Sequence, residues 1–417
     1  MTVVEYTWRD SEPRSAPLRA FNAIGAGLSR LGLERPALTS ESVLAAAVKA
    51  AGADDFGSDS YREPLEIFVA ACRDQAQLTP FGRFLIARML RRALANRLAL
   101  QSWATEHPEV REETIAGPWV IVGLPRTGTS ILDMLLGLDP RARPLLQWEA
   151  AHPIPPVTQA EAASDPRIAR TDSELDGLMK LNPPLRAMHP FGATLAEECV
   201  TLFMYDLRTL ALETQAHVPG YARWLEQADM APAYAQHRLA LQTLQSRRPT
   251  GRWILKTPNH LWHLDALLAT YPDARIIWTH RDPGPVVTSL ASLANAAQLP
   301  LTRRRDPRPT AAEWRRKCGF ALRSAMSHDD KAASGWCHHV HYDALMADPV
   351  RTVGDLYRSF GDEISDEHAR RMTALLRDRP KDAFGRHRYD PADFGWTYAE
   401  ISEEFGDYAD RYGVRPE

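Results

Sequence analysis

The chain has 417 residues, of which 25% are charged, and its formal net charge at pH 7 is −3. So small a net charge provides no broad cationic surface, and we expect neither nucleic acid nor an anionic membrane as a partner. No 18 consecutive residues are apolar and the first twenty lack the apolar segment of a signal peptide, which predicts a cytoplasmic protein without a transmembrane segment.

Residues 1–115 form the first predicted region, which is helical. A long stretch of periodically spaced apolar residues runs from Tyr61 to Ala104, and we find no convincing strand in the region. We expect it to pack on the domain formed by residues 116–417.

Four short apolar runs predict the strands of a sheet. They are Trp119–Val122, Trp253–Leu255, Ile276–Thr279 and Cys337–Tyr342, with helical patterns between them. Strands that alternate with helices predict an α/β fold with a parallel, P-loop-like sheet flanked by helices. Most of the chain between the first two strands is predicted to be helical, and residues from about 150 to 250 are expected to form a cap over the substrate.

The first strand runs into the loop GLPRTGTS, which has the glycine spacing of a phosphate-binding loop. Apolar residues at helical spacing follow Ser130, so the loop is expected at a helix N-terminus, where an anion is favoured. Thr129 stands where a kinase or ATPase needs a lysine, which favours a different phosphorylated anion. The residues assigned to this site are Pro125, Arg126, Thr127, Gly128, Thr129 and Ser130.

A second anion-binding element follows the third strand. Arg281 comes directly after the strand in ARIIWTHRDPGPVVTSLASL, and Ser289 lies about two helical turns into the next helix, so both side chains can converge on one phosphate. Together the loop and this element resemble the sulfotransferases that use 3′-phosphoadenosine 5′-phosphosulfate (PAPS), in the bacterial branch with a helical N-terminal region.

The resemblance extends over most of the chain. Its marks, in order, are ANRLAL, GLPRTGTS, the Trp148-Glu149 pair, WILKTPNHL, THRDP, YDALMADP and GRHRYDPADFG. It implies that the loop holds the 5′-phosphosulfate and that Arg281 and Ser289 hold the 3′-phosphate. It also implies that a late segment closes over the 3′-phosphate with Arg386, His387 and Arg388.

Sulfuryl transfer to a hydroxyl needs a cation at the leaving phosphate and a base for the hydroxyl proton. Arg126 is the first candidate cation. The second is Lys256, because it ends the strand RWILK and strand C-termini line the ligand crevice of an open α/β sheet. We expect PAPS as the donor co-substrate and no metal ion, because the transfer requires none in principle.

The predicted base is Glu149, which lies 23 residues after Arg126. This spacing is similar to that between the loop cation and the catalytic glutamate of sulfotransferases with a carboxylate base. Other members of the family carry a histidine two residues after this lysine, but here that position is Pro258. The alternative bases are His260, Glu198 and His189.

The cap is expected to bind the acceptor, a small-molecule or lipid-like compound with a hydroxyl group whose identity stays open. The residues assigned to it are Trp148, His152, His189, Phe191 and Glu198. Two other functions also stay open: a P-loop kinase or nucleotide hydrolase, and a non-catalytic nucleotide-binding protein. The oligomeric state, monomer or homodimer, is open as well.

The last predicted strand carries residue types that bind metals. In an alternating strand His339 and His341 share a face with Cys337 while His338 points away, and no further ligand recurs nearby at a metal-site spacing. We therefore expect a sheet strand here and no metal site. The four cysteines of the chain are far apart and form no C-x-x-C pair, which is typical of reduced thiols.

Overall fold

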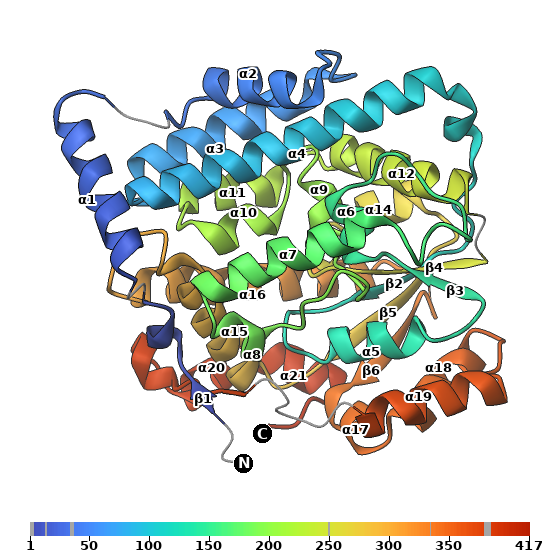
Figure 1. Cartoon of the computed structure of the whole chain (residues 1–417). Helices are drawn as coiled ribbons and strands as arrows, with labels where there is room; N and C mark the ends of the chain where they lie inside the picture. The colour runs from blue at the N-terminus through green and yellow to red at the C-terminus, as the bar shows by residue number, and fades with distance from the viewer. Residues whose placement is uncertain (1–3, 13–14, 34–36, 249–250, 334, 379–384) are drawn as a thin grey trace.

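The computed structural model describes residues 4–12, 15–33, 37–248, 251–333, 335–378 and 385–417. Its centre is a five-stranded parallel sheet in the order β3-β4-β2-β5-β6 (Figure 1). The strands are β2 Trp119–Val122, β3 Ala142–Pro144, β4 Arg252–Lys256, β5 Arg275–His280 and β6 Cys337–His341. The predicted parallel sheet flanked by helices is confirmed. The sequence missed the edge strand β3, because its three residues are Ala, Arg and Pro and carry no apolar pattern.

The two faces of the sheet bury different side chains, since successive residues of a strand point to opposite faces. Trp119 and Ile121 of β2 join one apolar cluster, with helices α5, α17, α18 and α19. Val120 and Val122 join a larger cluster on the other face. Burial on both faces explains why β2 is apolar throughout. The four helices are α5 Thr129–Leu136, α17 Tyr342–Ala347, α18 Pro349–Ser359 and α19 Asp366–Asp378.

The N-terminal region shares the larger core. Leu65, Phe68 and Leu94 belong to the same buried cluster as Val120 and Val122 of the sheet. The elements of this region are β1 Glu5–Tyr6, η1 Trp8–Ser11, α1 Ala16–Arg30, α2 Ser40–Ala51, η2 Asp59–Tyr61, α3 Arg62–Asp74, α4 Pro80–Glu106 and η3 Pro108–Glu112. The expectation that it contains no strand is wrong for β1, which pairs in parallel with β7, Arg386–His387. Two residues are too few to show a periodic pattern, and the partner strand lies at the other end of the chain.

The chain between β3 and β4 is mostly helical, as predicted. In Figure 1, α7 crosses the front of the molecule between α4 and α5. The helices of this segment are α6 Gln147–Ala151, α7 Pro166–Leu181, α8 Leu185–Met188, α9 Val200–Phe203, α10 Leu210–Gln215, α11 Pro219–Gln227 and α12 Ala231–Ser246.

The remaining helices follow β4, β5 and β7. They are α13 Asn259–Trp262, α14 Leu264–Thr270, α15 Pro283–Gln298, α16 Arg308–Asp329, η4 Pro391–Phe394, α20 Tyr398–Glu404 and α21 Gly406–Tyr412. Within the described ranges, no helix has the length and hydropathy of a membrane span. Each of the four cysteines, all within the described ranges, carries a free thiol.

Candidate functional site

The loop between β2 and α5 is shaped by its two glycines. Gly123 has a φ of +147°, and a Cβ there would lie 2.2 Å from the Thr279 hydroxyl. Gly128, with a φ of +88°, immediately precedes the first residue of α5. Arg126 adopts a φ of +73° without being a glycine. The chain therefore turns tightly into the N-terminus of α5, the arrangement that favours a bound anion.

The loop hydroxyls divide into two roles. Thr127 is buried, its Oγ1 donates to the carbonyl oxygen of Leu124 at 2.7 Å, and the same atom lies 2.6 Å from Oγ1 of Thr279. Ser130 Oγ instead accepts a hydrogen bond from Lys256 Nζ at 3.3 Å. Thr127 thus braces the loop from inside, and Ser130 links it to the end of β4.

Lys256 is the buried cation at the centre of the site. Its Nζ lies 3.1 Å from Glu198 Oε1 and 3.8 Å from Asp133 Oδ2. Burial alone would lower the pKa of Lys256, but Glu198 and Asp133 outweigh that effect and hold the pKa above its ordinary value. Lys256 is therefore charged at neutral pH and can balance a bound anion.

Two acids beside Lys256 were not found from the sequence. Burial raises the pKa of Asp133 to about 7 even though the Lys256 charge opposes the rise. Burial, reinforced by Glu198, likewise raises the pKa of Glu197 to about 7. The only signal for Asp133 was an acid within the apolar helix SILDMLL, where a charge needs a partner.

The structure brings two of the predicted cap residues to Lys256. The Glu198 side chain is 19% exposed, so it is open to a substrate while it contacts the lysine. Burial lowers the pKa of His189 to about 4, with Glu198 opposing and the charges of Lys256 and Arg126 reinforcing the change. His189 therefore lies within electrostatic reach of all three residues and is neutral at pH 7.

Arg126 lies with the second anion-binding element instead of with Lys256. Its Nε donates to Ser289 Oγ at 3.1 Å and its Nη1 to the carbonyl oxygen of Met188 at 2.5 Å. Arg281 Nη1 in turn donates to the carbonyl oxygen of Arg126 at 2.9 Å. Arg126 therefore links the loop to both Arg281 and Ser289, and their convergence on one phosphate stays a prediction.

The guanidinium of Arg281 is held between an aromatic ring and a carboxylate. It lies 3.9 Å from the ring centroid of Tyr342. Its Nε and Nη2 donate to the two carboxylate oxygens of Glu417 at 2.6 and 2.7 Å. A bidentate carboxylate occupies the two donors that a phosphate would use. No pattern in the sequence pointed to Glu417, which lies 136 residues from Arg281.

In the predicted late segment, His387 contacts helix α15. Its Nε2 lies 2.8 Å from Ser292 Oγ, one helical turn beyond Ser289, and burial together with the Arg126 charge lowers its pKa to about 3. Arg386, in β7, and Arg388, directly after β7, flank His387 and are exposed. Arg388 pairs with Glu5 at 3.0 Å.

Glu149 forms ion pairs with two arginines, Arg143 and Arg248. Its side chain is 1% exposed, and its carboxylate accepts from Arg143 Nη2 at 2.8 Å and from Arg248 Nη1 at 3.4 Å. It also accepts from the backbone N–H of Leu146 at 3.3 Å and so caps α6. These contacts commit the carboxylate to structural partners, and its assignment as the base stays a prediction.

The other predicted residues contact different partners, except that the Phe191 ring packs against His189 with the centroids 4.9 Å apart. His260 is fully buried, with Nδ1 2.8 Å from the Tyr234 hydroxyl. Trp148 is 1% exposed beneath the guanidinium of Arg167. Phe191 packs at the edge of the larger core.

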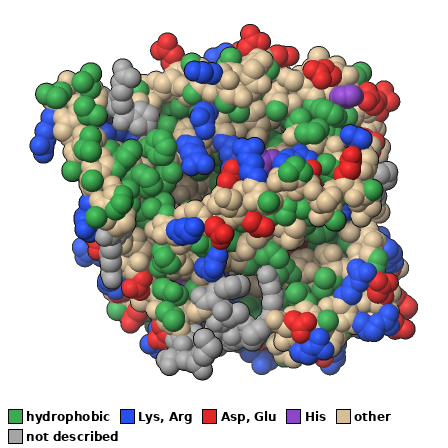
Figure 2. Space-filling view, in the orientation of Figure 1, with side chains coloured by type: hydrophobic (Ala, Val, Ile, Leu, Met, Phe, Trp, Pro, Cys, Tyr) green, Lys and Arg blue, Asp and Glu red, His purple; other side chains and the backbone are tan. Residues whose placement is uncertain are grey.

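His152 lines a basic cavity of about 420 Å³ between α4 and α7. Its Nε2 lies 2.9 Å from Arg92 Nη2. Figure 2 shows the basic side chains around this hollow. The arginines of the lining are Arg88, Arg91, Arg92, Arg167 and Arg170.

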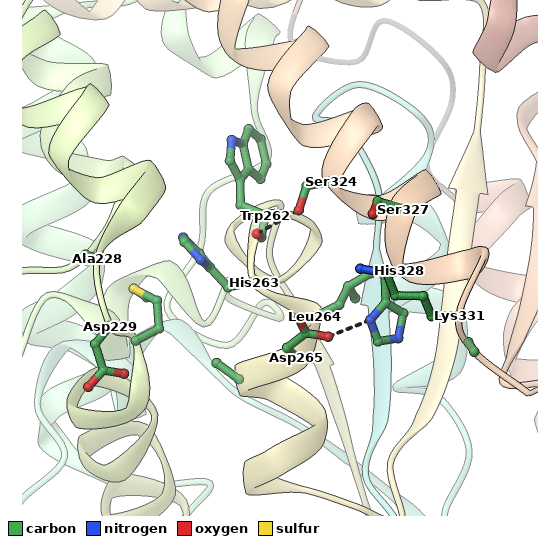
Figure 3. Close-up of a pocket in the computed structure, with 13 residues that line it drawn as sticks. Ala228, Asp229, Trp262, His263, Leu264, Asp265, Ser324, Ser327, His328 and Lys331 are labelled. Carbon is green, nitrogen blue, oxygen red and sulfur yellow. Dashed lines mark hydrogen bonds and ion pairs between the residues drawn. The ribbon is translucent and has the colours of Figure 1, made fainter.

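A second cavity, of about 470 Å³, lies between α13–α14 and α16. Figure 3 shows His328 facing Asp265, with Nδ1 and Oδ1 2.7 Å apart, and Ser324 donating to the carbonyl oxygen of Trp262. Among the described residues that line this cavity, none was predicted to be a site residue. Size alone therefore does not locate the site.

Comparisons with known proteins identify the family and the fold. The model of the sulfotransferase family matches residues 118–366. The structure of sulfotransferase STF1 from Mycobacterium tuberculosis is similar with a TM-score of 0.80 and 35% identity, over 88% of this chain and 98% of that one. Sulfotransferase STF9 from Mycobacterium avium is similar with a TM-score of 0.84 and 29% identity, over 92% and 99% of the two chains. A comparison with curated protein sequences returned no match.

Proposed function

This chain belongs to the sulfotransferase family, and from that premise we propose that it transfers a sulfuryl group from PAPS to a hydroxyl group of a small-molecule acceptor. The observation that carries the proposal is the position of Lys256. Its ammonium lies 3.3 Å from Ser130 at the N-terminus of α5 and 3.1 Å from Glu198. One buried cation thus joins an anion-binding helix end to a carboxylate, the two groups that the transfer needs.

The donor is argued from two separate anion-binding groups. The loop amides and Lys256 suit the 5′-phosphosulfate. Arg281 and Ser289, which meet through Arg126, suit a second phosphate. A nucleotide with phosphates at two positions of its ribose uses both groups, whereas the triphosphate of ATP would engage the first alone. Thr129 in place of the Walker lysine supports the same choice.

In the proposed reaction the acceptor oxygen attacks sulfur in line with the bond to the 5′-phosphate. The new S–O bond forms as the bond between sulfur and the phosphate oxygen breaks, and adenosine 3′,5′-bisphosphate leaves. The acceptor proton passes to a carboxylate. Lys256 and the amides at the start of α5 stabilise the charge that gathers on the leaving phosphate, because they are fixed in a site with little water.

We assign the base to Glu198. It is partly exposed and contacts Lys256, so an acceptor hydroxyl that reaches the sulfur can also reach this carboxylate. Glu149, which the spacing in the sequence favours, is held by Arg143 and Arg248. His189 lies near Glu198 and is neutral, which suits a hydrogen-bonding partner of the acceptor.

The test is sulfuryl transfer from PAPS labelled in the sulfuryl group to a panel that contains a phenol, a primary alcohol and a glycolipid. We expect labelled product and equimolar bisphosphate, in the presence of EDTA as well as magnesium. Lys256→Ala should abolish the product, and the matched control Lys331→Ala, at an exposed lysine, should not.

Two outcomes would contradict the proposal. Magnesium-dependent ATP hydrolysis without PAPS turnover would show a nucleotide hydrolase. Tight binding of the bisphosphate without transfer to any acceptor would show a binding protein.

A further inference from the structure

A cluster of three metal-ligand side chains lies buried behind the site. One ligand atom each from Cys199, His237 and His260 lies within 4.8 Å of the other two. All three residues are 0% exposed. Cys199 immediately precedes α9, His237 belongs to α12, and His260 belongs to α13. Three segments that are far apart in the sequence therefore meet here.

The hydrogen bonds of the two histidines leave one nitrogen of each free. His237 Nδ1 lies 2.7 Å from the Tyr271 hydroxyl, and His260 Nδ1 lies 2.8 Å from the Tyr234 hydroxyl. The Nε2 atoms of both rings are buried without a hydrogen-bond partner among the described residues. A buried polar atom without a partner destabilises the fold, so two of them beside one thiol call for a ligand.

We propose that Cys199, His237 and His260 bind a buried structural zinc ion, with an enclosed water molecule as its fourth ligand. Sulfur and imidazole nitrogen are ligands that zinc prefers, and metal-binding histidines are characteristically held through their other nitrogen, as the two tyrosines hold these. Three atoms within 4.8 Å of one another leave a central ion at most about 2.8 Å from each, against zinc bonds of about 2.0–2.3 Å. Small side-chain rotations close that difference.

Zinc binding takes a proton from the cluster. The ion replaces the thiol proton, which passes to solvent, and the sulfur binds as thiolate.

The ion would hold the two segments that carry the proposed catalytic pair. Cys199 follows Glu198 directly, and its backbone N–H donates to the carbonyl oxygen of Lys256 at 2.8 Å. His260 lies four residues after Lys256 on the same segment. Because the cluster lies beneath these backbones and is closed to solvent, the ion has a structural role, and the transfer itself can still proceed without a metal at the reacting atoms.

A second cluster of one cysteine and two histidines lies at β6 and serves as a control. Cys337 Sγ lies 3.4 Å from His339 Nε2, and His339 Nδ1 lies 2.8 Å from His280 Nε2. His280 Nδ1 lies 2.9 Å from the Tyr408 hydroxyl. The ring nitrogens of these two histidines all have partners, unlike those of His237 and His260. The Cys337→Ala variant is therefore the matched control for Cys199→Ala.

The test measures zinc in the full-length protein after dialysis against a weak chelator. We expect about one zinc per chain in the wild type and in Cys337→Ala, and at least a tenfold lower content in Cys199→Ala and His237→Gln. Circular dichroism checks the fold of each variant. The cobalt-substituted wild type should show a thiolate-to-cobalt charge-transfer band and tetrahedral ligand-field bands.

Three results would overturn the proposal. The wild type could retain no zinc and bind no cobalt, the cobalt spectrum could lack the thiolate band, or zinc could be lost from Cys337→Ala and kept in Cys199→Ala. The first two results are measured on the wild type, so the proposal can be refuted even if a variant fails to fold. Because zinc content is measured without PAPS, this result is also independent of the proposed transfer reaction.

Discussion

Replacing Glu149 by glutamine should destabilise the fold and leave sulfuryl transfer by the folded protein close to normal. The carboxylate is 1% exposed, and its main partner, Arg143, has a side chain that is 4% exposed. Glutamine keeps the size of the side chain but removes the charge that balances this arginine. Breaking a buried ion pair from one side costs about 3–5 kcal/mol, because the remaining charge stays buried without compensation.

That cost can be converted into a melting temperature. Unfolding entropy is about 2.1 cal/mol/K per residue, so for 417 residues the expected decrease in Tm is about 3–6 °C. The parallel variant Glu198→Gln should behave in the opposite way. Loss of a general base lowers the rate of transfer by about 10²–10⁴-fold, or about 3–5 kcal/mol of barrier. The loss of stability should be smaller than in Glu149→Gln, because the Glu198 side chain is 19% exposed and Asp133 still lies 3.8 Å from Lys256 Nζ.

The assay combines the melting temperature and the single-turnover rate on the same preparation of each variant. An alcohol acceptor is required, because a phenol with a low pKa depends less on a base and would hide part of the defect. Glu367→Gln, which removes an exposed carboxylate, serves as the control for charge loss. A Glu149→Gln protein with an unchanged Tm and a hundredfold slower transfer would refute the reasoning and make Glu149 the base.

Four other predictions can be checked by calorimetry, kinetics and denaturation. Arg281→Ala should weaken binding of adenosine 3′,5′-bisphosphate by about 10–100-fold through loss of charge-assisted hydrogen bonds, with little change for AMP; equal losses for both nucleotides would remove Arg281 from the 3′-phosphate site. Glu417→Ala frees that guanidinium and should tighten bisphosphate binding by up to about fivefold, since an ion pair with one exposed partner is worth about 1 kcal/mol; weaker binding would show that Glu417 does not compete with the phosphate. Lys256→Ala should lower turnover at least a hundredfold and raise the PAPS Kd less than tenfold, and the reverse pattern would make it a binding residue only. Burial lowers the pKa of His189 to about 4 and that of His387 to about 3. Below pH 6.5 each histidine therefore takes up a proton on unfolding, which should lower the free energy of unfolding by about 2 kcal/mol per histidine at pH 5. Urea unfolding that gives the same free energy at pH 7.5 and pH 5 would contradict this.

The sequence alone was sufficient for the parallel α/β class and for four of the five strands of the central sheet. The core of each predicted strand is present, because apolar runs such as Trp119–Val122 are local signals that report burial on both faces of a sheet. The glycine loop before α5 was predictable for a similar reason, since glycine spacing and the following helical pattern lie within one short stretch. Elements without such a pattern were missed, namely β3 and the pairing of β1 with β7.

The partners of individual side chains were decided only by the tertiary structure. The sequence analysis predicted that Arg126 and Lys256 contact the same phosphate. In the structure α15 packs against the loop, so that Arg126 contacts Ser289 while Lys256 contacts Glu198. It also could not show that Cys199 meets two histidines from other helices.

These contacts join residues that are tens to more than one hundred positions apart. Their distances depend on how helices and strands dock through their whole buried surfaces, and no local periodicity encodes that docking. Side-chain periodicity within one element therefore determined the fold class and the loop, whereas the assembly of elements determined which charges neutralise one another and which carboxylate remains open to a substrate.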